Sequence, residues 1–203
     1  MIFASALALS AALAAQSNST PENFAFSCDG PWSLDGNSNL MRCSHPTIRQ
    51  DDLEIRADSA QATNVEFDKN SKWTFTGNVH IKADAATLDA SSAVFTFDNN
   101  KLSHGELTGT PASFTAMRAE PGKTPVRGSA NKIAFDYVGK TLHLSEHVTL
   151  TRDRLVWQSC DLVYNLKTEG FGSGDADCPE KSEIRVLPAP KEGPTSATPA
   201  PAP

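Results

Sequence analysis

Residues 73–81, WTFTGNVHI, decide the fold class of this chain. Their bulky apolar side chains fall at alternate positions, and Thr, Asn and His stand between them. Residues 141–150, TLHLSEHVTL, repeat the scheme, with Gly77 and Glu146 sharing the parity of the apolar residues. A period of two residues is typical of a strand with one buried face and one wet face. Beyond the apolar N-terminal run, no long stretch has the period of a helix, so the chain is predicted to be all-β.

A short phrase recurs about four times along the chain. An apolar pair precedes an acid or amide, and a turn and an alternating strand follow. The phrase stands at Phe67-Asp68, Phe97-Asp98, Phe135-Asp136 and residues 162–166, with spacings of about 30, 38 and 30 residues. Repetition at this period indicates a stacked array of antiparallel hairpins. Because one hairpin cannot bury its own apolar face, neighbouring repeats must share one long apolar interior.

The alternation also supplies the residues expected to line that interior. On their own, such residues most often form the closed core of a sandwich, although an open groove would use the same pattern. The functional question is therefore what the interior holds. The candidates are Phe67, Phe75, Val79, Ile81, Phe95, Phe97, Phe114, Ile133, Phe135, Leu144, Val148, Leu162 and Tyr164.

Composition and termini set the limits of the folded domain. The 203 residues carry a formal net charge of −6, which disfavours a general role in nucleic-acid binding. Residues 1–15 are apolar and end in small residues, which is typical of a secretory signal peptide and too short to span a membrane. Because no Lys or Arg lies near Met1, the translation start is expected upstream. We expect a polar extension at residues 16–46, the β domain at 47–187 and a disordered Pro/Ala-rich tail at 188–203.

Four cysteines favour disulfides over a metal site. An even number in an exported chain suggests two disulfides, and four cysteines allow three connectivities. We favour the local pairs Cys28–Cys43 and Cys160–Cys178, because each closes a loop rich in Gly, Asp and Ser. Zinc sites usually carry ligand pairs two to four residues apart, and the sequence has no such pair of cysteines.

Three stretches in a fixed order make the repeats recognisable. WTFTGNV at residues 73–79 is followed by GTPASF at 109–114 and by PVRGSA at 125–130. This succession resembles the LptA family, the periplasmic lipopolysaccharide-transport proteins of the OstA-like superfamily. The resemblance covers about residues 47–188. The cysteines and the N-terminal extension depart from the family's best-known members.

The resemblance implies an open β-jellyroll, in which two twisted sheets face each other as a V-shaped trough. It further implies a periplasmic protein that stacks head to tail between an LptC-like inner-membrane component and an LptD-like outer-membrane component. Lipopolysaccharide would move along the shared groove with its acyl chains against the lining residues. Each CH₂ removed from water would contribute about 0.8 kcal/mol. The resemblance implies no cofactor.

Strand addition would join successive copies, because the open edges of a sheet carry unpaired N–H and C=O groups. Residues 48–56 would form the leading edge, and strands near residues 160–166 and 183–187 the trailing edge. The phosphorylated head of the lipid would lie outside in water, within reach of basic residues at the rim. These are Lys82, Arg118, Lys123, Arg127, Arg152 and Arg154.

The sequence favours no enzyme. His143 and His147 are four residues apart, but on a strand they would lie about 13 Å apart, so one metal ion cannot bridge them. The sequence contains no nucleophile-elbow, zinc-protease or P-loop motif. Three alternatives stay open: a membrane-tethered jellyroll component of the same pathway, a structural β-repeat protein with a dry core, and a polysaccharide-active enzyme with two facing carboxylates.

Overall fold

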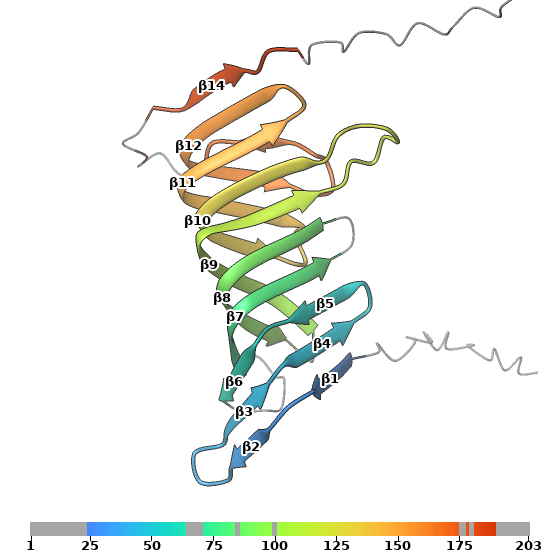
Figure 1. Cartoon of the computed structure of the whole chain (residues 1–203), viewed down its shortest axis with the longest axis vertical. Helices are drawn as coiled ribbons and strands as arrows, with labels where there is room; N and C mark the ends of the chain where they lie inside the picture. The colour runs from blue at the N-terminus through green and yellow to red at the C-terminus, as the bar shows by residue number, and fades with distance from the viewer. Residues whose placement is uncertain are drawn as a thin grey trace, which may run out of the picture.

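The computed structural model describes residues 24–63, 71–83, 86–98, 101–174, 178 and 181–189. Within these ranges every regular element is a β-strand, and the strands pair in antiparallel fashion. They belong to one sheet that is not closed into a barrel. The first and last strands lie at opposite ends of its long axis (Figure 1). The prediction of an open all-β fold is therefore confirmed.

The long strands β7 to β12 form the middle of the sheet, and shorter strands flank them. In chain order the strands are β1 (Phe24–Cys28), β2 (Trp32–Asp35), β3 (Leu40–Ser44), β4 (Pro46–Gln50), β5 (Leu53–Arg56), β6 (Ser59–Thr63), β7 (Lys72–Ala83), β8 (Ala86–Asp98), β9 (Lys101–Ala116), β10 (Val126–Asp136), β11 (Thr141–Arg152), β12 (Leu155–Asn165), β13 (Phe171–Gly172) and β14 (Glu183–Val186). The repeated phrase ends β8, β10 and β12, where every second strand reaches the same margin of the sheet. Its copy at Phe67-Asp68 lies outside the described residues.

The sheet folds along its middle into two halves, which we call arm A and arm B. Arm A contains β2, β3, β6, β13 and residues 72–76, 92–98, 101–108, 132–136, 141–145 and 161–165 of the long strands. Arm B contains β1, β4, β5, β14 and residues 79–83, 86–90, 112–116, 126–130, 148–152 and 155–159. In the N-terminal part β1 with β2, β3 with β4, and β5 with β6 each act as one bent strand. The trough expected from the sequence is thus one sheet folded on itself.

A line of β-bulges, which we call the crease, separates the two arms. In β11 the register shifts between Ser145 and Val148. A bulge places an extra residue on one strand and bends it, so the chain turns from one arm into the other. The sequence pattern placed Glu146 on the inward face, and this is wrong: Glu146 and His147 are exposed and have φ of 65° and 58°. Gly77 occupies the equivalent bend of β7, also with positive φ.

Backbone hydrogen bonds connect the bends of the N-terminal strands, so the crease continues through them. The amide of Asp29 donates to the carbonyl of His45 (3.2 Å), and the amide of His45 donates to the carbonyl of Asp58 (2.8 Å). The amide of Asp58 then donates to the carbonyl of Gly77 (2.9 Å). The carboxylate of Asp58 also accepts a bond from the side-chain amide of Asn78 (2.9 Å). The bends of successive strands are therefore in register, and β1 to β6 continue the same folded sheet.

These N-terminal strands change where the sheet begins. The sequence predicted residues 48–56 as the leading edge, next to a polar extension at 16–46. In the structure β1 pairs with β4, and β2 pairs with β3, so residues 24–44 belong to the sheet and β1 and β2 form its edge. The edge prediction is therefore wrong. The sequence contains no signal for these short strands, because they are rich in polar residues and show no long alternation. At the other end, β14 borders arm B as predicted, and the two-residue β13 borders arm A.

Two glycines let aromatic rings lie against the backbone of a neighbouring strand. Gly105 stands opposite Phe95, and Gly128 stands opposite Phe114. A Cβ atom at Gly105 would lie 2.6 Å from the ring of Phe95, and one at Gly128 would collide with the ring of Phe114. Both rings are buried. A side chain larger than hydrogen would push each ring out of the interior.

Replacing Gly128 with Ala should therefore lower the free energy of unfolding by about 1–3 kcal/mol, because Phe114 must move within a filled interior. Urea unfolding followed by intrinsic fluorescence measures this change. Gly172→Ala is the matched control, since nothing lies within 4 Å of its Cβ position, and it should change stability by less than about 0.5 kcal/mol. Equal stability of the two variants would contradict the packing argument.

Candidate functional site

The interior between the two arms contains the residues predicted to line it. Every predicted lining residue that the structure describes has at most 4% of its surface exposed. Phe67 lies outside the described residues. The others are Phe75, Val79, Ile81, Phe95, Phe97, Phe114, Ile133, Phe135, Leu144, Val148, Leu162 and Tyr164. Their contact with a ligand stays a prediction.

The inward faces of the two arms meet each other. The ring of Phe26 in arm B lies 4.8 Å, between centroids, from the ring of Trp73 in arm A. Further along, the ring of Phe114 in arm B lies 5.3 Å from the ring of Tyr164 in arm A. Buried apolar residues of both arms form one continuous cluster. Side chains of both arms therefore fill most of the space between them.

The interior offers apolar contact and little polar chemistry. Among the described residues, only Thr47, Gln50 and Ser71 are buried polar residues. The same part of the chain contains no group of three or more His, Cys, Asp or Glu that could hold a metal ion. None of its segments forms a helix long and apolar enough to cross a membrane. The chemical capacity of this interior is to keep an apolar molecule away from water.

The two arms are offset from each other along the long axis. We count β1–β2, β3–β4 and β5–β6 as one bent strand each. On this count Phe26 in β1 contacts Trp73 in β7, which is three strands later. Phe114 in β9 contacts Tyr164 in β12, which is also three strands later. Gln50 in β4 accepts a bond from the amide of Leu102, four strands later. At these three places arm B therefore faces the part of arm A that stands three or four strands further along. At the C-terminal end, Trp157 of β12 contacts Phe171 of β13, the next strand (4.7 Å between centroids).

The offset leaves arm A uncovered at the N-terminal end. Trp32 and Leu34 of β2 are 66% and 50% exposed. They stand opposite Cys43 and Met41, which are buried or packed against the core, so all four face the inward side. The apolar lining of arm A thus continues past the point where arm B ends.

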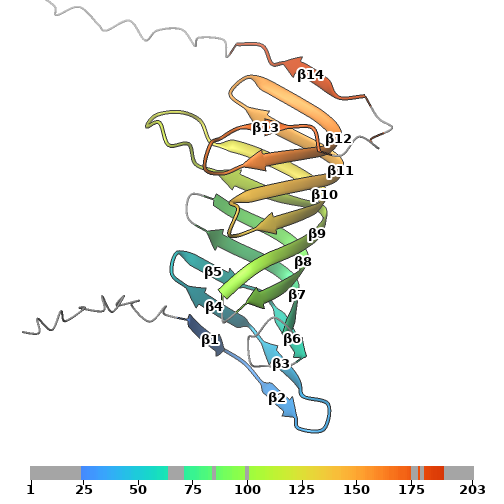
Figure 2. The same cartoon turned by 180° about the vertical axis from the view of Figure 1, so that it is seen from behind.

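Arm B is uncovered in the same way at the C-terminal end. Ile184 and Val186 of β14 are 62% and 66% exposed. They stand opposite Trp157 and Leu155 of β12, on the side where Trp157 packs against the core. β2 and β14 lie at opposite ends of the molecule (Figure 2). Each end therefore presents an apolar inward face on one arm and lacks the facing arm.

In the described part of the chain, polar contacts at two places tie the arms together on the open side, away from the crease. Near the N-terminal end, the side-chain carbonyl of Gln50 accepts a bond from the amide of Leu102 (3.1 Å) inside the protein. Near the C-terminal end, the loop after β9 meets the loop after β12. There Arg118 Nε donates to one carboxylate oxygen of Glu169 (3.1 Å), and the amide of Ala119 donates to the other (2.7 Å). We call this second contact the Arg118 tie.

Charge strengthens the Arg118 tie. The Arg118 side chain is 9% exposed and also contacts the carboxylate of Asp153 (3.1 Å). Arg152 adds a bond to the backbone carbonyl of Glu169 (3.2 Å). The Ala119 amide, followed by Arg118, lowers the pKa of Glu169 below its usual value. In turn Glu169 raises the pKa of Arg118. Both groups are therefore charged at neutral pH.

A cavity of about 500 Å³ opens between the two ties. Arm B contributes Ala83, at the end of β7, to its wall. Arm A contributes the hairpin after β10 and the turn after β12. The lining from arm A consists of Phe135, Val138, Gly139, Lys140, Leu166 and Lys167.

Most of the basic residues expected at the rim make bonds within the protein. Arg118 and Arg152 belong to the Arg118 tie, and Arg154 donates to a backbone carbonyl just beyond β14 (2.9 Å). Lys123 forms an ion pair with a glutamate in its own loop (3.6 Å). Arg118, Arg152 and Arg154 thereby fix the loops at the C-terminal end, whereas the exposed ion pair of Lys123 contributes little to stability.

The basic residues that line the cavity, Lys140 and Lys167, are not among those predicted from the sequence. Lys82 and Arg127, the other two expected rim bases, are exposed but do not line it. Sequence reasoning missed Lys140 and Lys167. The only available signal was the turn at Val138-Gly139, which places Lys140 at the end of a hairpin.

A disulfide lies near each end of the crease. Cys28 of β1 joins Cys43 of β3, and Cys160 of β12 joins Cys178, which precedes β14. These are the two local pairs favoured from the sequence. Each one fastens a terminal strand of the sheet to the bent strand beside it.

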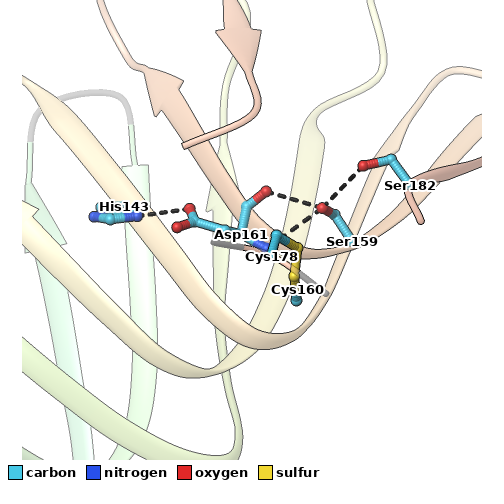
Figure 3. Close-up of a disulfide and its surroundings, with 6 residues drawn as sticks. All are labelled: His143, Ser159, Cys160, Asp161, Cys178 and Ser182. Carbon is cyan, nitrogen blue, oxygen red and sulfur yellow. Dashed lines mark hydrogen bonds and ion pairs between the residues drawn. A yellow bond between two sulfur atoms is a disulfide. The ribbon is translucent and has the colours of Figure 1, made fainter. Parts of the chain in front are cut away.

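The two histidines on β11 lie outside the interior and contact different partners. His143 Nε2 lies 2.6 Å from the carboxylate of Asp161, beside the C-terminal disulfide (Figure 3). His147 Nδ1 lies 3.1 Å from the side-chain amide of Asn131. They thus belong to the outward face, where the sequence placed them.

Comparison with known proteins relates this chain to lipopolysaccharide transport. Residues 54–170 match a family model described as "LptA/(LptD N-terminal domain) LPS transport protein". The crystal structure of LptH from Pseudomonas aeruginosa, described as the LptA homologous periplasmic component of the lipopolysaccharide transport device, superposes with a TM-score of 0.58 at 13% identity. The match covers 67% of this chain and 95% of LptH, and at this identity it shows the fold alone. No curated protein matches the sequence.

Removing the charge of Glu169 should release the Arg118 tie. In Glu169→Gln, hydrogen exchange in residues 117–125 should rise at neutral pH, and the control Glu120→Gln, exposed in the same loop, should leave it unchanged. Because folding lowers the pKa of Glu169, its contribution is present above the ordinary value of about 4.3 and is lost as the pH falls through the lowered value. Wild-type protection, corrected for the intrinsic exchange rate, should therefore fall in that acidic range. A loop equally protected in all three proteins would contradict the tie.

Proposed function

The chain belongs to the LptA/LptD N-terminal family of lipopolysaccharide transport proteins, and we propose that it carries lipopolysaccharide through the periplasm from the inner to the outer membrane. It acts as one segment of a head-to-tail bridge, with the acyl chains held between arm A and arm B. The role is that of a carrier and includes no catalytic step. The observation that supports it best is the continuous apolar interior of a sheet that stays open along one side.

Affinity for the lipid comes from the apolar lining. Acyl chains gain about 0.8 kcal/mol for each CH₂ removed from water, so a few chains need no specific polar contact. The lining residues are buried between the two arms. A lipid therefore has to separate the arms, and its chains take over the contacts that the arms make with each other.

The construction of the sheet favours such an opening. The strand pairs of the described chain connect the arms through the crease. On the open side, the contacts named above are made by side chains, at the Gln50 bond and the Arg118 tie. Separation of the arms would break these side-chain contacts and keep the hydrogen bonds within each arm. The main cost is the exposure of apolar surface, about 25 cal/mol per Å², which the lipid offsets.

The offset of the arms supports head-to-tail stacking. The open edge of β14 in one copy would receive β1 of the next copy, extending arm B by strand addition. By the same offset, Ile184 and Val186 of the first copy would face β6 or β7 of the second. Trp32 and Leu34 of the second copy would face β10 or β11 of the first. The stack would thereby continue the three- to four-strand offset across the junction and cover both apolar faces.

The same edges would serve the ends of the bridge. An LptC-like inner-membrane component would meet the edge formed by β1 and β2, and an LptD-like outer-membrane component would meet the edge formed by β13 and β14. Both partners would need jellyrolls with matching open edges, because strand addition recognises backbone more than side chains.

A second function is favoured by the filled interior. A structural β-repeat protein would use the same lining residues as a permanent dry core, and their burial suits that role. The two functions differ in one respect. Only the carrier admits lipid between the arms.

Site-specific photo-crosslinking in the periplasm tests the carrier function. With the photoreactive residue at Phe75, Phe135 or Leu144, lipopolysaccharide adducts should form, because these side chains face the interior. The outward His143 is the control and should give none. If no inward position gives an adduct in a protein that is folded and exported, the structural role is the correct one.

Charges on the uncovered face of β14 test the stacking. Ile184→Glu with Val186→Glu should keep the protein monomeric at concentrations where the wild type self-associates, because each carboxylate would be buried at the junction. Sedimentation velocity over a range of concentrations measures this. The control Arg185→Gln changes the opposite face of the same strand and should behave as the wild type. Identical association of both variants would contradict the proposed junction.

A further inference from the structure

The cavity on the open side has a composition that the carrier function alone does not explain. Its volume of about 500 Å³ lies within the range of small-molecule sites, roughly 300–1,000 Å³. Its wall combines Ala83 of arm B with Phe135 and Leu166 of arm A. Ala83 and Phe135 are also members of the buried core cluster. The cavity therefore leads from the surface to the apolar interior.

Two lysines stand at the mouth of this cavity. Lys140 follows β10 and Lys167 follows β12, at the ends of neighbouring hairpins. The ammonium of Lys140 lies 4.0 Å from the centroid of the Tyr137 ring, and this cation–π contact holds it at the mouth. In the ranges that the structure describes, neither lysine forms an ion pair. Val138, which also lines the cavity, is 79% exposed.

These two cations lie beside an apolar wall in an acidic protein. The carboxylate of Asp136, in the same hairpin as Lys140, accepts a bond from the amide of Gly139 (2.8 Å). The chain carries a formal net charge of −6. Near the ends of the arms, carboxylates neutralise other bases, as Glu169 and Asp153 do for Arg118. A cationic mouth above an apolar wall attracts an anion that is attached to an apolar tail. The anion then meets the ammonium groups, and the tail meets the apolar wall.

We propose that this cavity is a side opening that holds the head of a phosphorylated lipid. Lys140 and Lys167 bind a phosphate group, and one acyl chain passes Phe135 into the interior. A lysine ammonium is a compact charge with three donors, which suits phosphate oxygens. This inference rests on the carrier function and adds to it a fixed place for the head group, at the ends of β10 and β12. The rest of the head stays in water.

Equilibrium binding of lipid A with and without its phosphates tests the side opening. The variant Lys140→Gln with Lys167→Gln removes both charges and keeps polar side chains of similar length. Its affinity for diphosphoryl lipid A should fall about tenfold, as expected for two exposed charge contacts. Its affinity for dephosphorylated lipid A should match that of the wild type. Inorganic phosphate alone should bind the wild type far more weakly than the lipid, because it lacks the apolar tail.

The control removes the same charge elsewhere. Lys72→Gln with Lys181→Gln changes two exposed lysines that do not line the cavity, and it should bind both lipids as the wild type does. If the cavity variant keeps wild-type affinity for diphosphoryl lipid A, the side opening is wrong while the carrier function stands. An equal loss of affinity for both lipids would also overturn it, since the phosphate would then play no part. A wild type that binds neither lipid would overturn the carrier function and the side opening together.

Discussion

The bulges along the crease let each long strand turn from one arm into the other while apolar side chains face inward in both arms. In β11, Leu144 and Val148 both point into the interior, although Glu146 and His147 between them leave the pleat. In β11 two residues occupy the bend, so the alternation resumes in phase. In β8 and β10 the inward positions change parity across the crease, and apolar residues still fill the interior on both sides of it. One sheet can therefore supply both walls of a long apolar interior. The walls share backbone hydrogen bonds at the crease, and side-chain contacts hold them together elsewhere.

This arrangement links the interior to the ends of the molecule. Because the sheet is twisted, β1, β4 and β9 in arm B face strands of arm A that stand three or four positions later, so the two arms do not finish at the same place. At each end, the apolar lining of one arm therefore extends beyond the other arm. The exposed lining residues are Trp32 and Leu34 in β2 and Ile184 and Val186 in β14. A further copy, or another sheet of the same kind, would complete each end. The disulfides hold the terminal strands in place there, so the edges are ready-made surfaces.

The sequence predicted the features that depend on local pattern. Alternation in residues 73–81 and 141–150 identified the strands and their inward faces, because the pleat has a fixed period of two. It could not place Glu146, because a bulge breaks that period without a reliable local signal. The strands β1 to β3 were missed because they are short and lie in a polar, turn-rich stretch that shows no long alternation.

The contacts across the open side were beyond sequence reasoning altogether. Arg118 meets Glu169 across 51 positions of chain, and Gln50 meets Leu102 across 52. These partners depend on the twist of the whole sheet, which brings one arm of a strand opposite the other arm of a distant one. The lysines of the cavity became visible only in this way. Lys140 and Lys167 look like ordinary turn residues until both arms are in place.

The central claim is that the filled interior opens along its uncovered side to admit acyl chains. The most direct measurement is the distance between spin labels on the outward faces of the two arms, at Lys82 of arm B and Glu106 of arm A, with both native disulfides intact. Both positions are exposed and lie outside the interior, so the labels should not disturb the lining. The account predicts a longer distance when lipopolysaccharide is added and no change with a soluble polysaccharide that lacks acyl chains. A distance distribution that stays the same while lipopolysaccharide binds would contradict it.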